Sequence, residues 1–149
     1  MEYTRIEKDG FKVIGIRRIA PYGGGTWAIV NEDPTFGEKI TALTGKFFDL
    51  GLCFDFREDG SNDYMCAVEW NGEAEGFDSF TYPAATWLVF DAKGKISDGV
   101  LGKVWGYING EFLPKSGLTK CTATIEKYIL WDTTADACHV EIHIPIELK

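Results

Sequence analysis

The order of predicted secondary structure constrains this chain most, because one arrangement, strand–helix–strand–strand, occurs twice along it. Alternating apolar residues predict the strands, and apolar residues spaced three and four apart predict the helices. A repeated β-α-β-β unit can close into one sheet and leave a groove between its halves. We therefore predict an α+β fold in a single domain, residues 1–149: a duplicated β-α-β-β unit forming one antiparallel sheet with two helices and a central cleft. The predicted strands are residues 11–20, 52–57 and 64–70 in the first repeat and 83–90, 122–131 and 138–146 in the second.

Apolar residues that recur on one helical face predict both helices. The stripes are Ile40, Leu43, Phe47 and Leu50 in a helix over residues 38–50, and Val100, Leu101, Val104, Trp105 and Ile108 in the second helix. Gly51 suits the end of the first helix, and Ser97 suits the N-cap of the second, which should stop near residues 109–110. A glycine turn is predicted at residues 23–25 and a loop at residues 112–117.

Composition narrows the classes of function. A net charge of −8 and a pI of about 4.7 repel phosphate, so direct nucleic-acid binding is not expected. The sequence has no run of about 18 apolar residues and no apolar signal core at its start. We therefore expect no membrane span and a cytoplasmic protein. The cysteines are too widely spaced for a CxxC motif, so we predict four free thiols and no cofactor: Cys53, Cys66, Cys121 and Cys138.

Glu126 is the main candidate for a functional residue. It lies in the middle of the strand predicted over residues 122–131, on the face that alternation also gives to Tyr128. Two interpretations are open. Glu126 can be a solvated charge on an edge strand, because glutamate is rarely buried unless it is paired. It can also be an acidic group at the floor of an aromatic cleft, where it selects cationic or hydrogen-bond-donating ligands.

Aromatic residues make up 14% of the chain, and five of them are tryptophan. That is more flat apolar surface than a core of this size needs, so some rings are candidates to line a pocket. Each candidate also has an interpretation as ordinary core packing. The aromatic candidates for ligand binding are Tyr128, Trp87, Trp105, Trp70 and Tyr64.

Two histidines and a glutamate share one face of the last predicted strand: His139, Glu141 and His143. Histidines four residues apart on a strand are separated by about 13 Å, which is too far for one ion without other ligands. The sequence therefore predicts no metal site, and surface positions are expected for these residues.

Three segments carry a resemblance to a known family. They are the pentapeptide beginning at Phe11 (Phe-Lys-Val-Ile-Gly), the tripeptide Glu126-Lys127-Tyr128, and the final Val-Glu-Ile-His-Ile-Pro-Ile of residues 140–146. In this order, and over essentially the whole chain, they resemble the GyrI-like family, the effector-binding domain of AraC-type and multidrug-responsive regulators. The resemblance implies a cleft for small hydrophobic, often cationic, molecules, with Glu126 contacting the ligand between aromatic side chains.

The resemblance also implies alternatives. Regulators of this type carry a separate helix-turn-helix region, for which this chain has no room, so a stand-alone binding protein is expected. Some stand-alone relatives are hydrolases that open cyclopropane rings of genotoxic natural products; in that case Glu126 would direct a water, with Tyr128 beside it. A protein-interaction inhibitor is a further alternative. The expected partner is a small hydrophobic or cationic molecule, and a homodimer or a separate regulator stays open.

Overall fold

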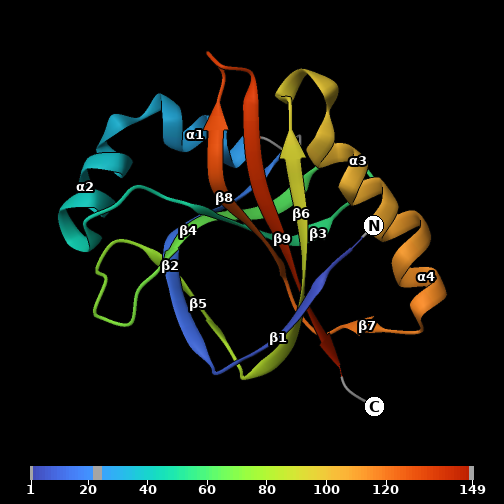
Figure 1. The fold of residues 1–149 in the computed structure, drawn as a ribbon. Coiled ribbons are helices and arrows are strands. Elements are labelled where there is room, and N and C mark those ends of the chain that lie inside the picture. The colour runs from blue at the N-terminus through green and yellow to red at the C-terminus, as the bar shows by residue number, and fades with distance from the viewer. Residues whose placement is uncertain (1, 22–24, 148–149) are drawn as a thin grey trace. The chain divides into compact units, whose positions relative to one another are not determined.

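The structure is a computed structural model, and it describes residues 2–21 and 25–147 (Figure 1). The chain divides into two compact units, which we call the first unit (Asp9–Ala84) and the second unit (Met1–Lys8 with Ala85–Lys149). Each unit combines helices with an antiparallel sheet. The predicted α+β class is therefore confirmed.

The first unit contains two helices and four strands. In chain order they are β2 (Phe11–Ala20), α1 (Gly25–Glu32), α2 (Pro34–Thr44), β3 (Leu50–Phe56), β4 (Asn62–Glu69) and β5 (Asp78–Tyr82). The strands pair antiparallel in the order β3-β4-β2-β5. Apolar side chains of β2 and β4 pack against residues of both helices in one buried cluster: Ile14, Ile16, Val30, Ile40, Phe48, Tyr64, Cys66 and Val68.

Helix α2 shows how local sequence sets the boundaries of an element. The Asp33 carboxylate accepts a hydrogen bond from the Thr35 amide at 2.9 Å, and Pro34 occupies the first turn, where its missing N–H costs nothing. Gly45, at φ 84°, ends the helix and donates its amide to the Thr41 carbonyl at 2.8 Å. The helix predicted to run on to Leu50 is therefore wrong in its second half.

The second unit contributes five strands and a run of helical turns. They are β1 (Thr4–Lys8), β6 (Ala85–Gly94), the 3₁₀ turn η1 (Ile96–Asp98), α3 (Val100–Tyr107), the π-helical turn η2 (Ile108–Phe112), α4 (Leu113–Ser116), β7 (Thr119–Lys120), β8 (Thr124–Asp132) and β9 (Ala137–Glu147). The main strand order is β1-β6-β9-β8, and β7 pairs with the end of β9. The core lies between one face of β6 and β9 and the helical segment of α3 and η2, where Val104 and Ile108 meet Phe90, Val140 and Ile142.

The helical run of the second unit differs from the sequence prediction at both ends. Ser97 is not an N-cap: it lies in η1 and bonds through its amide and hydroxyl to the Asp136 carboxylate, while Gly99, at φ 65°, precedes α3. At the other end the chain continues through η2 and α4 to Gly117, at φ 73°. The loop predicted over residues 112–117 is therefore wrong.

Each unit contains a strand, a helix and two further strands in that chain order, but the first unit also has a second helix, α2, and a fourth strand, β5. The prediction of two helices in the whole fold is therefore wrong. That this shared order arose by duplication of one unit stays a prediction, and so does the central cleft. Of the turn predicted at residues 23–25, residues 23 and 24 lie outside the described residues, and Gly25 begins α1. None of the four cysteines, all of which the structure describes, forms a disulfide. Within the described residues, no helix has the length and apolar character needed to cross a membrane.

Candidate functional site

Glu126 lies on the helix-covered face of the sheet in the second unit. It is in β8, and its partner in β9 is Ile142, a core residue that packs with α3. Because paired residues of antiparallel strands point to the same face, the carboxylate lies in this apolar layer. Only 7% of Glu126 is exposed. The interpretation of Glu126 as a solvated surface charge is therefore wrong.

Two side chains donate hydrogen bonds to this carboxylate. The indole Nε1 of Trp105, on α3, lies 2.8 Å from Oε2, and the Tyr128 hydroxyl lies 3.2 Å from Oε1. Carboxylate oxygens accept hydrogen bonds, so this one side chain satisfies both donors. The helix and the strand thus place a negative charge among aromatic rings at a site largely closed to water.

A third aromatic residue joins this group because of a β-bulge. The register of β8 against β9 shifts between Tyr128 and Leu130, so that Trp131 pairs with Cys138, a residue on the same face as Val140. The shift returns Trp131 to the face of Tyr128, and their rings meet edge to face with centroids 5.8 Å apart. Trp131 is 46% exposed. Plain alternation places Trp131 on the opposite face, so sequence reasoning missed it. We call Glu126, Trp105, Tyr128 and Trp131 the Glu126 site.

Trp87 does not belong to this group. It pairs with Pro145, and Leu88 beside it pairs with Ile144 of the α3-facing core. Trp87 therefore points to the opposite face of the sheet from Glu126, where its ring lies 6.4 Å from that of His143. It is 1% exposed. The geometry of the sheet therefore does not favour contact between Trp87 and a ligand that Glu126 holds on the α3 side.

The last two aromatic candidates, Tyr64 and Trp70, belong to the first unit. Tyr64 is buried on β4, and its hydroxyl accepts a hydrogen bond from Trp27 Nε1 at 2.8 Å. Trp70 follows β4 and donates its Nε1–H to the Glu73 carbonyl at 3.3 Å. Tyr64 packs in the core of that unit and Trp70 against it. Their predicted role as ligand contacts stays a prediction.

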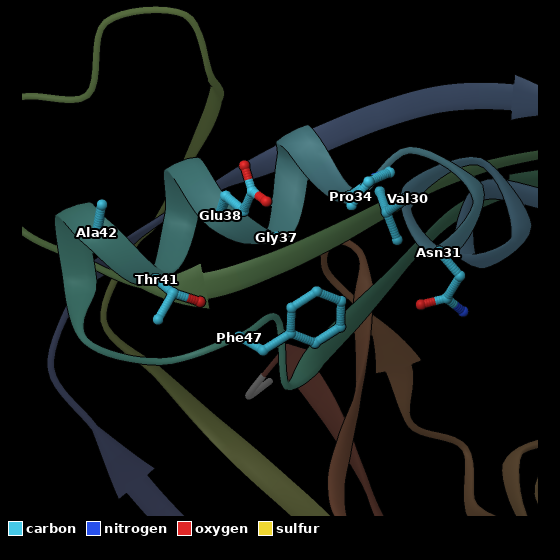
Figure 2. A pocket seen from close by; sticks show the side chains of 8 residues that line it. All are labelled: Val30, Asn31, Pro34, Gly37, Glu38, Thr41, Ala42 and Phe47. Atoms are coloured by element: carbon cyan, nitrogen blue, oxygen red, sulfur yellow. The ribbon is translucent and has the colours of Figure 1, made fainter.

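The first unit also has a surface groove of its own. Its volume is about 580 Å³, within the range of small-molecule pockets. Figure 2 shows the Phe47 ring beside α2, between Thr41 and Ala42 of α2 on one side and Val30 and Asn31 of α1 on the other. Gly37 allows the ring to come close, because a Cβ there would lie 2.9 Å from Phe47 Cε2. The carboxylate that lines the groove, Glu38, is exposed, so water weakens its attraction for a cation.

Comparison with known proteins identifies the class of protein first. The chain is an effector-binding domain, the class that the resemblance in its sequence predicts. More narrowly, it belongs to the family of integron-associated effector binding proteins, Cass2, whose family model matches residues 5–146. No significant match was found among curated protein sequences.

Several solved structures share the fold. SAV2435 bound to tetraphenylphosphonium is 23% identical, with a TM-score of 0.74 over 99% of this chain and 94% of that one. The C-terminal domain of EcmrR is 19% identical, with a TM-score of 0.74 over 99% and 98%. A hydrolase from Listeria innocua is 10% identical, with a TM-score of 0.58 over 98% and 92%. At these identities the likeness establishes the fold and no more.

Proposed function

We propose that the chain binds a small hydrophobic cation, whose charge pairs with the carboxylate of Glu126 and whose apolar groups pack against the rings of Trp105, Tyr128 and Trp131. The observation that carries this proposal is the burial of Glu126. A carboxylate that is 7% exposed and accepts hydrogen bonds from an indole and a phenol is uncommon in an apolar layer. Membership of an effector-binding family supports a ligand site in this chain.

The physical chemistry of the site favours one class of cation. Two charges attract more strongly in a site of low dielectric than in water, but a small, strongly hydrated ion loses much of its solvation on entering. A large cation with delocalised or shielded charge has little hydration to lose. Aromatic rings add a cation–π contribution of about 0.5–2 kcal/mol. SAV2435, which shares the fold, is bound to tetraphenylphosphonium, a cation of this kind.

Trp105 controls how a ligand reaches the carboxylate. Its indole donates to Oε2 from α3, and α3 covers this face of the sheet. A cation that approaches Oε2 must displace that N–H or share the oxygen with it, whereas the Tyr128 hydroxyl can stay on Oε1. We therefore expect α3 or the Trp105 side chain to move when ligand binds. Trp131, at 46% exposed, is the most exposed of the four residues of the Glu126 site.

Calorimetric titration with tetraphenylphosphonium tests the proposal. Glu126→Gln keeps the shape of the side chain and removes its charge, so we expect binding at least tenfold weaker, a loss of about 1.4 kcal/mol or more. The control is Glu7→Gln, which removes an exposed charge from β1, separated from β8 by β6 and β9. It should bind as the wild type does. Equal affinity in the wild type and Glu126→Gln would contradict the proposal.

Hydrolysis of a cyclopropane ring is the alternative that the fold keeps open, because a Listeria innocua hydrolase shares it. A charge pair needs only the charge of Glu126, whereas a general base needs an oxygen aligned with a water. Both oxygens of Glu126 already accept side-chain hydrogen bonds, which favours binding. Incubation with a cyclopropane-bearing compound, followed by mass spectrometry, separates the two: addition of one water that is lost in Glu126→Gln would establish the hydrolase.

A further inference from the structure

Three side chains with metal-binding atoms meet on the face of the second unit's sheet that points away from α3. His139 and Glu141 are two residues apart on β9, and Asp91 on β6 is the direct cross-strand partner of Glu141. The ligand atoms of these three residues all lie within 4.8 Å of one another. His139 and His143 are too far apart on one strand to share an ion, as their spacing in the sequence indicates. The neighbouring strand supplies Asp91 instead.

The distances are close to those that one ion requires. Zinc binds imidazole nitrogen at about 2.0–2.1 Å and carboxylate oxygen at about 2.0–2.2 Å, so its ligand atoms lie at most about 4.4 Å apart. His139 Nε2 and Asp91 Oδ1 are already 2.6 Å apart. The Asp91 side chain is 63% exposed and can move by a few tenths of an ångström without disturbing the core. The backbone is fixed, because β6 and β9 pair continuously from Thr86 to Gly94 (Figure 1).

Glu141 is held by a neighbour in the way that metal ligands commonly are. Its Oε1 lies 3.1 Å from Nε2 of His143, whose side chain is only 18% exposed. Such an outer contact orients a ligating carboxylate and leaves its other oxygen for the ion. His143 is therefore not the surface residue that the sequence suggests, and it is placed to position Glu141 rather than to bind metal itself.

Nearby charges determine which kind of ion fits. Lys127 on β8 pairs with Glu141, and Lys93 on β6 pairs with His139, so two cationic side chains share this face with the cluster. Their repulsion disfavours ions held by charge alone, such as Mg²⁺ or Ca²⁺. An imidazole ligand adds coordinate bonding that favours first-row transition ions.

We propose that Asp91, His139 and Glu141 bind one divalent transition metal ion of the Zn²⁺ class across β6 and β9, with a fourth position open to water. The site lies on the opposite face of the sheet from Glu126 and does not depend on the function proposed above. It joins two paired strands, so a bound ion stabilises the second unit by mass action.

Proton NMR of the histidine rings tests the site, because the chain has two histidines and their signals can be assigned with His143→Gln. Titration with ZnCl₂ should shift the His139 ring signals in the wild type and raise its melting temperature. The variants Asp91→Asn and Glu141→Gln should each weaken binding by about tenfold or more, and His139→Gln should abolish the rise in melting temperature. Asp98→Asn, which removes an exposed carboxylate from η1, should behave as the wild type does.

Three results would overturn the proposal. The His139 signals could stay unchanged at millimolar Zn²⁺. The variant His139→Gln could keep the wild-type rise in melting temperature, which would mean that the ion binds elsewhere, for example at a cysteine. Mg²⁺ could reproduce the effect of Zn²⁺ at equal concentration, which would mean a general response of an acidic protein. Circular dichroism of each variant establishes that it is folded before titration.

Discussion

Removal of the indole N–H of Trp105 should destabilise the protein through Glu126. In Trp105→Phe, Oε2 loses a donor at 2.8 Å, while Oε1 keeps the Tyr128 hydroxyl at 3.2 Å. A hydrogen bond to a charged group contributes about 1.5–3 kcal/mol. The carboxylate can recover part of that loss by admitting water. We therefore expect a coupling free energy of about 1–2 kcal/mol between the two side chains, a factor of about 5–30 in the unfolding equilibrium.

A double-mutant cycle measures this coupling apart from the loss of ring area. The free energy of unfolding in urea at pH 7 is compared for the wild type, Trp105→Phe, Glu126→Met and the double variant. The control is Trp70→Phe combined with Glu126→Met, because the Trp70 indole donates to the Glu73 carbonyl at 3.3 Å and not to Glu126. The control pair should be additive. Coupling between Trp105 and Glu126 below about 0.5 kcal/mol would refute the reasoning.

Two further predictions concern the scaffold. Gly102→Ala should stabilise the protein by about 0.5–1 kcal/mol, because Gly102 is inside α3 and a Cβ there meets no described atom within 4 Å. Gly15→Ala should destabilise it by about 3 kcal/mol, because its Cβ would lie 1.8 Å from the backbone oxygen of Cys66. Thermal unfolding checks both, and equal effects of the two substitutions on stability would contradict the packing argument. The Arg17 guanidinium, with hydrogen bonds of 3.0 and 2.8 Å, lowers the pKa of Asp63. The ion pair should therefore add about 0.5–1 kcal/mol of stability above about pH 4, and this is lost as the pH falls through the lowered pKa. The gap in urea midpoint between wild type and Asp63→Asn should close in acid, and a gap that widens there would contradict the assignment.

Strands were the most predictable part of the fold, because a buried face repeats every second residue. The prediction for β2 matches the observed strand, and that for β9 differs by one residue at each end. Helix boundaries were less predictable. Both Gly45 and Gly51 can end a helix, and the sequence does not show that Gly45 takes the left-handed conformation while Gly51 lies inside β3. Helix α1 was missed because its eight residues are too few for a clear apolar stripe.

Three residues of the candidate site, Glu126, Tyr128 and Trp105, could be proposed from the sequence, but the contacts between them could not. A carboxylate beside a tyrosine on a β-branched strand pointed to Glu126 and Tyr128. The donation from Trp105 depends on how α3 packs across the sheet, which no local pattern contains. Trp131 joins the site only because a bulge shifts the register by one residue, and a shift of one residue exchanges the two faces of a strand. The cross-strand cluster with Asp91 was missed for a related reason, since it depends on strand pairing.

The most direct test of the charge of Glu126 is selectivity between a cation and a neutral molecule of similar shape. Tetraphenylphosphonium and triphenylphosphine oxide share three phenyl groups on phosphorus, but only the first carries a net positive charge. The wild type should bind the cation at least tenfold more tightly, and this preference should fall close to unity in Glu126→Gln. The same preference in both proteins would show that Glu126 does not recognise the charge, and would contradict the proposed function.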